Sequence, residues 1–476
     1  MNKQFRIALI LLATGIGAMA QNEKDAFRYA QYSPTGTARY SALAGSMGAF
    51  GSDFSCLSAG NPAGIGLFKR FEFTFTPAVS HNRISTAYNG TKQSGTSTPF
   101  IISNLGVVFV GTTDTTAGWK SIQFATGLNN LARYDGLSFV SGGNEGATNY
   151  FDYVAKEYAS FSDFADNALK YGLIGALRGG GYYSLVNADF NQQQISSTSG
   201  YLNEYVFSFG GNYNDKLFLG ATLGIPFFKY YEKTTYTESS NPYYDSLIVF
   251  NEFSEKASGV NLKLGVIYQP VNYLRLGAAF HTPTWYPNVK ERYESSIDVL
   301  GVPDTGNKYV DIWLDGDATI FNYSLRTPYH ATGSIAFIYK NKGFVNVDYE
   351  YVDYTASELQ SENYNFSHEN GRINSHYAGT HTVRAGGELN LSPLVLRLGY
   401  AYSSNPYRRE VEKNGSRHTV SGGVGLKWKT FFADFAYMYR FGRDKDVFYD
   451  HPSVNPYSVR FVNQVFALTV GWKIKM

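Results

Sequence analysis

"LSAGNPAGIGLFKRFEFTFTPAVS", residues 57 to 80, joins two kinds of sequence. Its first half consists mainly of small residues and proline, which are too small to build a core but let backbones pack closely. Its second half places Phe71, Phe73, Phe75 and Val79 on one face with polar residues between them, which is the period of two of a β-strand. A close-packing segment therefore runs directly into a strand with an aromatic face.

The same alternation recurs along the rest of the chain and predicts strands over 71–81, 97–110, 118–130, 201–213, 216–230, 258–270, 273–284, 328–340, 342–354, 378–391, 394–404, 416–429, 431–441 and 460–475. The connections between these strands are alternately short and long. The long ones cover 82–96, 131–200, 231–257, 285–327, 355–377, 405–415 and 442–459, with 131–200 and 285–327 the longest. We therefore predict a 14-stranded antiparallel transmembrane β-barrel over 71–476 with long extracellular loops.

Three further patterns favour a membrane barrel over a soluble β-sandwich. The hairpin around Lys429 and Thr430 places Leu426 opposite Ala433 on the apolar face and leaves Lys427 and Asp434 on the other. Tryptophans fall near the predicted strand ends, as in interfacial girdles, at Trp119, Trp285, Trp428 and Trp472. The last strand, 460–476, alternates to Met476 and resembles the C-terminal signal read by the barrel-assembly machinery, which more often ends in an aromatic residue.

The bulk composition is unlike that of an ordinary soluble domain. Aromatic residues make up 17% of the 476 residues, with 39 Tyr and 35 Phe, and there are 48 Gly. A formal net charge of +2 gives no indication of a nucleic-acid partner. With Cys56 as the single cysteine, an intrachain disulfide is excluded, and we expect neither a metal nor a cofactor.

The N-terminus has the pattern of an export signal. Lys3 and Arg6 precede an apolar run that ends in Ala18-Met19-Ala20, the small-x-small pattern of a signal peptidase site. We expect residues 1–20 to be a cleaved signal peptide, and no later run of about 18 apolar residues predicts a membrane helix. Together with the strand pattern, this predicts a protein of the Gram-negative outer membrane in contact with its lipids.

Residues 21–70 show no strand alternation and are rich in small residues. A barrel of this width leaves a water-filled lumen unless another segment fills it, so we predict that 21–70 forms a small helical hatch inside it. The step from Asn61 to Pro62 ends any preceding helix at Asn61.

At these residues the sequence resembles the FadL family of outer-membrane transporters for long-chain fatty acids and aromatic hydrocarbons. The resemblance rests on "ALAGSMGAFGSDFSCLSAGNPAGIG", in which Asn61, Pro62 and Ala63 match the family's hatch motif, and on the segments 268–284 and 381–406. It implies passive uptake of a hydrophobic small molecule, which leaves the barrel sideways at a kinked third strand. Here that strand contains Gly127, Asn129 and Asn130, which interrupt its alternation.

Strand parity suggests basic groups that could hold a ligand carboxylate. Lys263, Arg275 and Arg384 face the lumen and are our candidate head-group contacts, although paired charges also line barrel interiors. Arg397 also faces inward, but its register opposite Glu388 predicts a structural ion pair. In 131–200, apolar residues at helical spacing could form an external capture groove or pack together as a cap.

Sequence signals for other functions are weaker. The eight histidines have no helical metal spacing and no G-x-S-x-G elbow occurs, so we do not expect an enzyme. A TonB-dependent receptor would need 22 strands, more than this chain can form. Uptake of aromatic hydrocarbons or haem, and a structural or adhesive role, remain as alternatives to fatty-acid transport.

Overall fold

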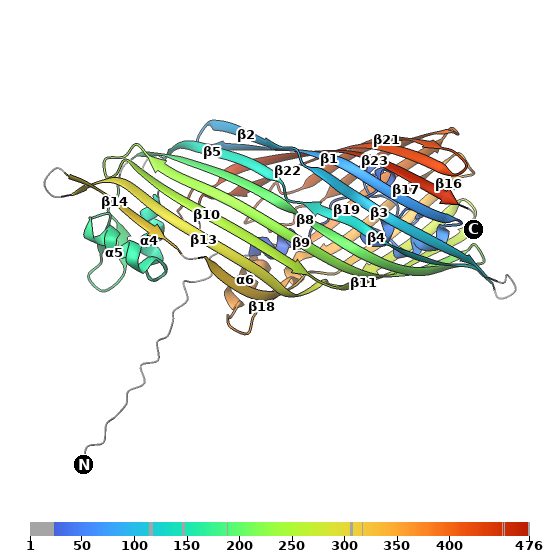
Figure 1. Ribbon diagram of the computed structural model, residues 1–476, viewed down its shortest axis with the longest axis horizontal. Helices are drawn as coiled ribbons and strands as arrows, with labels where there is room; N and C mark the ends of the chain where they lie inside the picture. Colours follow the sequence, from blue (N-terminus) through green and yellow to red (C-terminus); the bar gives the residue numbers. More distant parts are fainter. Residues whose placement is uncertain are drawn as a thin grey trace, which may run out of the picture.

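The computed structural model describes residues 23–113, 118–144, 148–187, 189–304, 308–316, 318–449, 451 and 453–474. The expected signal peptide and Met476 lie outside the described residues. The wall is a closed antiparallel β-barrel of 14 barrel strands, each made of one β-strand or of several β-strands that follow one another along the same line. Closure is made by the first and last strands, which pair from Phe71–Ile474 to Ala87–Ser458. The predicted fold class is confirmed (Figure 1).

Most barrel strands are uninterrupted: β1 (Phe71–Tyr88), β8 (Phe190–Tyr213), β9 (Leu217–Ser239), β17 (Gly343–Asp353), β19 (Gly379–Asn390), β20 (Leu394–Ser403), β21 (Arg417–Lys427), β22 (Phe431–Asp446) and β23 (Tyr457–Ile474). The others are interrupted: β2 (Thr91–Ser97) with β3 (Phe100–Thr112), β4 (Trp119–Arg133) with β5 (Gly136–Asn144), β10 (Ser246–Ser258) with β11 (Asn261–Val271), β12 (Leu274–His281) with β13 (Trp285–Asp304), and β14 (Lys308–Asp315) and β15 (Thr319–Arg326) with β16 (His330–Tyr339). Pro99, Pro283 and Pro328 lie at three of these breaks, where a residue without an N–H cannot donate to the ladder.

The two faces of the wall differ as the sequence pattern predicts. On β20, Leu396, Leu398 and Tyr400 are exposed on the outside, whereas Val395 and Arg397 are buried inside. The predicted register of the next hairpin is confirmed, because Leu426 pairs with Ala433 across β21 and β22. An outer surface of aliphatic and aromatic side chains is what a membrane barrel presents to lipid.

Several barrel strands are longer than the sequence pattern indicated. Segments 131–200 and 285–327, expected to be loops, contain β5, the first part of β8, and β13 to β15, which extend the wall at the end that carries α4 (Tyr150–Lys156) and α5 (Ser162–Lys170) (Figure 1). We call this the long-loop end, and the opposite end, with turns at 214–216, 272–273, 340–342 and 391–393, the short-turn end. Beyond a lipid layer both faces of a strand can be polar, so alternation is lost although pairing continues.

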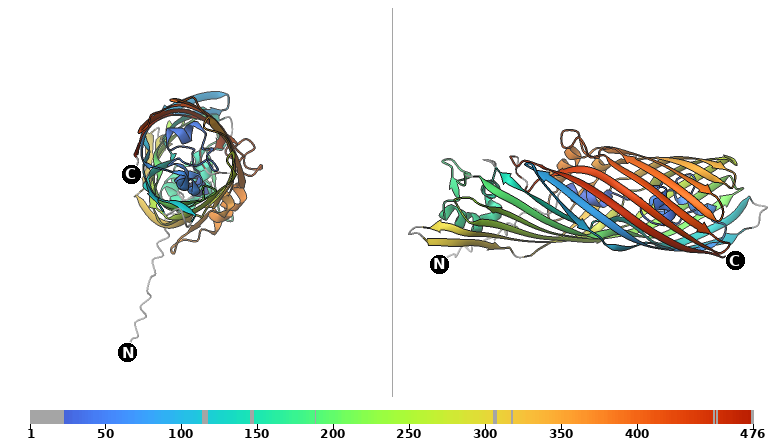
Figure 2. Two further views of the ribbon diagram at one scale, coloured as in Figure 1. Left: turned by 90° about the vertical axis from the view of Figure 1, so that its right-hand side faces the viewer. Right: turned by 90° about the horizontal axis from the view of Figure 1, so that it is seen from above.

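The segment before β1 forms α1 (Glu23–Ala30), α2 (Ala38–Ala42), α3 (Cys56–Ala59) and a 3-10 helix, η1 (Pro62–Leu67). Viewed along the barrel, these helices lie within the ring of strands (Figure 2). The remaining elements are η3 (Tyr158–Phe161), β6 (Ile174–Ala176), β7 (Tyr182–Ser184), η4 (Tyr354–Ala356), β18 (Glu358–Gln360) and α6 (Ser367–His376). Of these, β18 and α6 lie outside the ring, beside the middle of the barrel's length (Figure 1). None of the described helices is long and apolar enough to cross a membrane.

Glycines in the wall make room for the segment inside it. A Cβ on Gly399 would clash with the backbone of Leu43, and one on Gly423 would press on Ala42. On the other side of the lumen, a Cβ on Gly265 would overlap the side chain of Asn61. The inner segment and the wall are thus in close contact, backbone against backbone in places, and we call residues 23–70 the hatch.

Candidate functional site

Asn61 joins the hatch to the wall. Its Nδ2 donates hydrogen bonds to the carbonyl of Gly48, 2.8 Å away, and to that of Val266 on β11, 3.1 Å away. Its Oδ1 accepts from the N–H of Ala63 at 3.0 Å and so caps η1, whose first residue is Pro62. Both N–H groups and the oxygen of this fully buried amide are therefore engaged, and the bond to Val266 holds the tripeptide against the wall.

Acidic residues of the wall hold the middle of the hatch. On β17, the Asp348 carboxylate accepts from the N–H groups of Met47 and Gly48 at 3.0 and 3.1 Å. On β19, Glu388 accepts from Arg39 of α2 at 2.8 Å and also pairs with Arg397, the partner predicted from strand register. The hatch therefore carries donors where the wall carries carboxylates, and both sets lose water together.

Lys263, a predicted head-group contact, is completely buried. Its ammonium group pairs with Glu204 on β8 and donates to the carbonyl of Ser58 in α3 at 2.6 Å. Glu204 also accepts from Asn261 at 3.1 Å. The lysine thus balances a wall carboxylate and fastens α3.

The other two predicted contacts also have protein partners. Arg275 donates to Gln269 at 2.8 Å and to the carbonyl of Phe50 in the hatch at 2.9 Å. Arg384 donates to Glu350 at 2.8 Å. All three predicted basic groups face the lumen, as parity indicated, and the structure places them at separate points along the hatch.

The wall has a seam beside the predicted third strand. The ladder between β3 and β4 runs from Thr112–Ser121 to Asn104–Asn129 and ends there. Beyond Asn129, β4 and β5 pair with β8, and β2 pairs with β1. Across the gap the described residues make side-chain hydrogen bonds instead, including Asn82 Nδ2 to the carbonyl of Asp135 at 2.8 Å and Gln93 Nε2 to Ser141 Oγ at 2.7 Å.

The three residues predicted at this kink have different positions. Gly127 pairs with Gly106 within the regular ladder, where its missing side chain leaves room for the ring of Phe54 in the hatch. Asn129 is the last paired residue and accepts from Asn104 Nδ2 at 2.7 Å. Asn130 lies beyond the ladder, at an irregularity in the pairing of β4 with β8.

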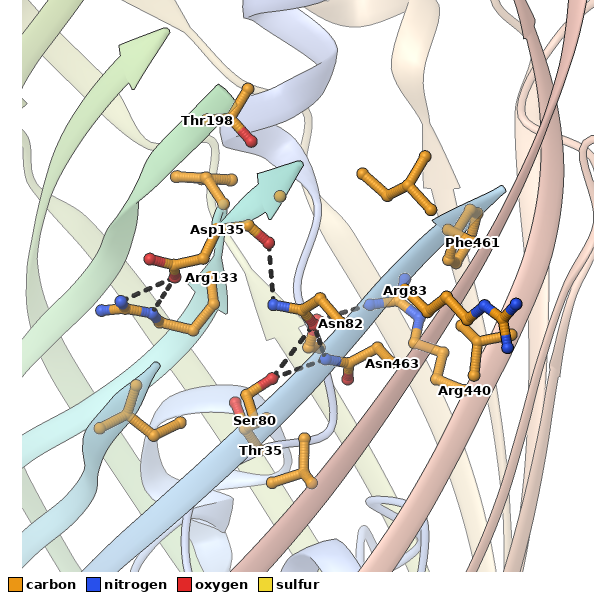
Figure 3. Close-up of a pocket in the computed structure, with 17 residues that line it drawn as sticks. Thr35, Ser80, Asn82, Arg83, Arg133, Asp135, Thr198, Arg440, Phe461 and Asn463 are labelled. Carbon is orange, nitrogen blue, oxygen red and sulfur yellow. Dashed lines mark hydrogen bonds and ion pairs between the residues drawn. The ribbon is translucent and has the colours of Figure 1, made fainter. Parts of the chain in front are cut away.

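A cavity of about 220 Å³ lies at this seam, between the wall and the hatch (Figure 3). Its polar lining comes from the hatch, β1, the residues around the break between β4 and β5, β8 and the last two strands: Ser33, Thr35, Ser80, Asn82, Arg83, Arg133, Tyr134, Asp135, Thr198, Arg440 and Asn463. Its apolar lining includes Ile84, Ile101, Phe461 and Val465. Sequence reasoning missed this site, because its walls come from strands that are distant in the chain and meet only when the barrel closes.

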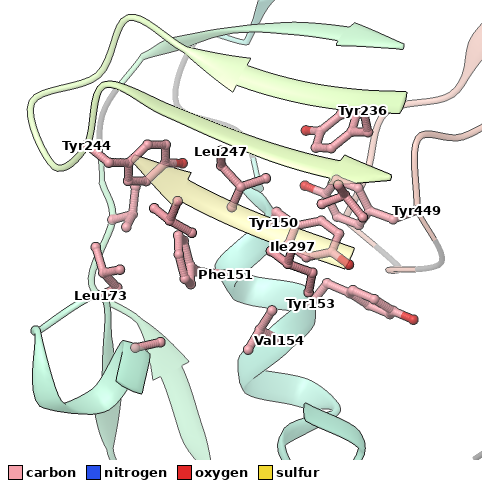
Figure 4. Packing of buried hydrophobic residues seen from close by; sticks show 14 of the residues in the cluster. Tyr150, Phe151, Tyr153, Val154, Leu173, Tyr236, Tyr244, Leu247, Ile297 and Tyr449 are labelled. Carbon is pink, nitrogen blue, oxygen red and sulfur yellow. The ribbon is translucent and has the colours of Figure 1, made fainter. Parts of the chain in front are cut away.

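Helices α4 and α5 pack on the inner face of the extended wall (Figure 4). Phe151 and Val154 of α4 and Phe164 of α5 are buried, and they belong to one cluster with Leu247 and Ile297 of the wall. The helical spacing seen in the sequence thus corresponds to a packed cap and not to an open groove on these faces.

A buried carboxylate holds the start of α4. Glu238 accepts from the hydroxyls of Tyr236 and Tyr244, each at 2.6 Å, and from the N–H of Tyr150 at 2.8 Å. It is the penultimate residue of β9, at the long-loop end, well past the roughly nine to eleven residues with which a tilted strand crosses a bilayer. Burial raises the pKa of Glu238 to about 7, with a smaller contribution from Asp152.

We therefore expect the cap to loosen as the pH rises. Because the pKa in the folded state lies above the ordinary value of 4.5, this group's stabilisation is fully present below that value and is lost as the pH rises through about 7. Hydrogen exchange of residues 150–156, corrected for intrinsic rates, should be several-fold faster at pH 8 than at pH 5.5. Glu238→Gln should remove the difference and Glu294→Gln, an exposed control, should keep it. An unchanged pH dependence in Glu238→Gln would contradict this.

Comparisons with known proteins agree on the fold. No family model and no curated protein matches the chain. Among solved structures, a Pseudomonas aeruginosa FadL homologue superposes with a TM-score of 0.51 at 15% identity, over 93% of this chain and 99% of that one. The Ralstonia pickettii toluene transporter TbuX gives 0.51 at 16% identity over 93% and 99%, and the P. putida toluene transporter TodX 0.51 at 12% over 94% and 100%. This chain therefore shares their fold over nearly its whole length.

Proposed function

We propose that this protein is a channel of the Gram-negative outer membrane that takes up hydrophobic small molecules and releases them sideways, into the membrane, at the seam beside Asn129 and Asn130. The observation that carries the proposal is the combination of a hatch fastened across the lumen with a ladder that stops in one part of the wall. The hatch opposes passage along the barrel axis, and the seam offers a path through the wall. The apolar outer surface supports the membrane location.

A sideways path suits an apolar solute for energetic reasons. Each CH₂ group that leaves water contributes about 0.8 kcal/mol, so a long alkyl chain held in protein or lipid would lose many kcal/mol on crossing an aqueous pore. Passing from the barrel directly into the bilayer avoids that loss. No energy source is needed, because the solute moves down its own gradient.

The proposed substrates are long-chain fatty acids, with monoaromatic hydrocarbons as the second candidate. The similar structures support both, since one is a FadL homologue and two are toluene transporters. We further propose that strand β23 and the residues after it, 460–476, are read by the barrel-assembly machinery, as the C-terminal alternation suggests.

Uptake measurements test this function and the role of the hatch motif together. Cells carrying the intact protein should accumulate labelled oleate or toluene faster than cells without it. Asn61→Ala should lower that rate several-fold, because it removes a helix cap, about 0.5 to 2 kcal/mol, and both hydrogen bonds to Gly48 and Val266. Asn341→Ala, at an exposed position in a short turn, is the matched control and should have no effect.

Two outcomes would count against the proposal. Equal uptake of both solutes with and without the protein would exclude transport of either class. Equal loss of uptake in Asn61→Ala and Asn341→Ala would mean that the change reports expression and not the hatch, which immunodetection of the folded barrel checks.

A further inference from the structure

Two arginines on the outer face of the wall lie directly opposite each other. The register of the last hairpin pairs Arg443 of β22 with Arg460 of β23, and both side chains are exposed. They share the outward parity of Phe435 and Phe466, which belong to the apolar outer surface. Like charges at directly opposite positions of a ladder destabilise it, so the fold gains no stability from this pair.

The two arginines lack the carboxylate partners that basic groups beside them have. Arg417, on the neighbouring strand β21, pairs with Asp444 at 3.7 Å. Within the part of the chain that the structure describes, no carboxylate lies within ion-pairing distance of Arg443 or Arg460. Each arginine carries five N–H donors and keeps its charge, so the pair has the capacity to hold an anion between its two guanidinium groups.

The height of the pair on the wall indicates which anion it would meet. Arg443 lies 12 residues along β22 from Phe431, and Arg460 lies 12 residues along β23 from Trp472, the partner of Phe431 near the short-turn end. At about 3.3 Å per residue and the usual tilt of about 35 to 45°, this distance rises about 30 Å through the membrane. The apolar band of a membrane barrel is about 25 Å tall, so the pair lies just beyond it, at the level of lipid head groups. Tyr439, four residues nearer the short-turn end on the same face, lies where an interfacial aromatic residue is expected.

We propose that Arg443 and Arg460 bind the phosphate group of a lipid in the outer leaflet, whose acyl chains lie along the apolar face of β22 and β23 toward the short-turn end. The inference rests on the membrane location in the proposed function, with the long-loop end outward, and not on transport. Arginine suits a phosphate because its planar fork donates two parallel hydrogen bonds. A phosphate shared by both guanidinium groups also offsets the repulsion between them.

Binding to the purified, folded barrel in an uncharged detergent tests the inference. The probes are lipid A, which is a glycolipid that carries phosphate, the same glycolipid after removal of its phosphate, and inorganic phosphate. The intact protein should bind lipid A at least about tenfold more tightly than the dephosphorylated form, the usual gain from hydrogen bonds to a charged group. The double variant Arg443→Gln/Arg460→Gln should lose this preference. Because the pair is exposed, salt at about 1 M should also weaken the preference in the intact protein.

Thermal unfolding separates lipid binding from a structural role of the pair. Lipid A should raise the unfolding midpoint of the intact protein and leave that of the arginine variant unchanged. Without lipid, the arginine variant should be at least as stable as the intact protein, because it lacks the like-charge pair. Lys340→Gln/Lys342→Gln is the matched control, since it removes the same charge from exposed positions at the short-turn end, and it should behave as the intact protein.

Three outcomes would overturn the inference. The first is equal binding of the two glycolipids by the intact protein. The second is a preference for lipid A that the arginine variant keeps, or that the lysine control loses to the same extent. The third is binding of inorganic phosphate as tightly as lipid A, which would assign the pair to free phosphate. Uptake of labelled oleate or toluene by cells tests the transport proposal separately, so the two can fail independently.

Discussion

Lys263→Met is expected to destabilise the folded barrel by about 3 to 5 kcal/mol, the usual cost of removing one partner of a buried ion pair. Lys263 and Glu204 are both completely buried, and the ammonium group also holds the carbonyl of Ser58. The substitution leaves Glu204 without its counter-ion at the contact of hatch and wall. Unfolding by urea in lipid vesicles, followed by gel mobility without heating, measures the change in free energy.

The double variant Glu204→Gln/Lys263→Met separates lost charge balance from lost packing. It removes both charges, so most of the stability should return. Lys92→Met, at an exposed position on β2, controls for the loss of a lysine and should be neutral. A single variant as stable as the intact protein would show that Glu204 finds another partner or is already neutral.

Filling the seam cavity should reduce uptake of hydrophobic solutes by at least about tenfold. Thr198 on β8 lines the cavity, and the indole of Thr198→Trp would occupy its space. A solute that passes would have to squeeze in beside the indole at a cost of about 1 to 3 kcal/mol, the usual penalty of overpacking, and 1.4 kcal/mol corresponds to a factor of ten. The adjacent Ser199 is exposed, so Ser199→Trp adds the same side chain outside the cavity and should leave uptake intact. The rate of labelled-oleate uptake per folded barrel is the measurement.

Full uptake by Thr198→Trp would contradict a path through this part of the wall. If both tryptophan variants lost uptake equally, the effect would come from impaired assembly and the seam would not be the cause.

Local sequence patterns were sufficient to predict most of the barrel strands. Period-two alternation gave the strand phase, and the hairpin register followed from it, because the two residues at a tight turn fix every later pair; Leu426–Ala433 and Glu388–Arg397 were both predicted this way. The same reasoning failed over 285–327, where strands continue into water and polar side chains occupy both faces. There the pairing is set by the neighbouring strands, which no local window contains.

The lumen contacts were harder to predict, because they depend on which distant elements meet inside. Parity correctly placed Lys263 inside, but its partner Glu204 lies two barrel strands away, across β9. Neither the register of β8 with β9 nor that of β9 with β11 contains the pair. Arg440 also follows from parity as an inward residue, yet its hydrogen bond to Ser33 joins it to a segment of the hatch that is distant in the chain. The wall glycines opposite the hatch carry no sequence pattern of their own, since their spacing follows the path of another segment.

The position of the hatch also constrains the order of events during biogenesis. It precedes β1 in the chain and contacts strands from around the ring, including β8, β11, β17 and β19, and the pairing of β1 with β23 closes the ring around it. A segment this closely fitted could not thread into a finished cylinder without breaking those contacts. The hatch must therefore be in place while the wall is still open. Each wall strand that carries a carboxylate for the hatch then pairs with a donor that is already positioned inside.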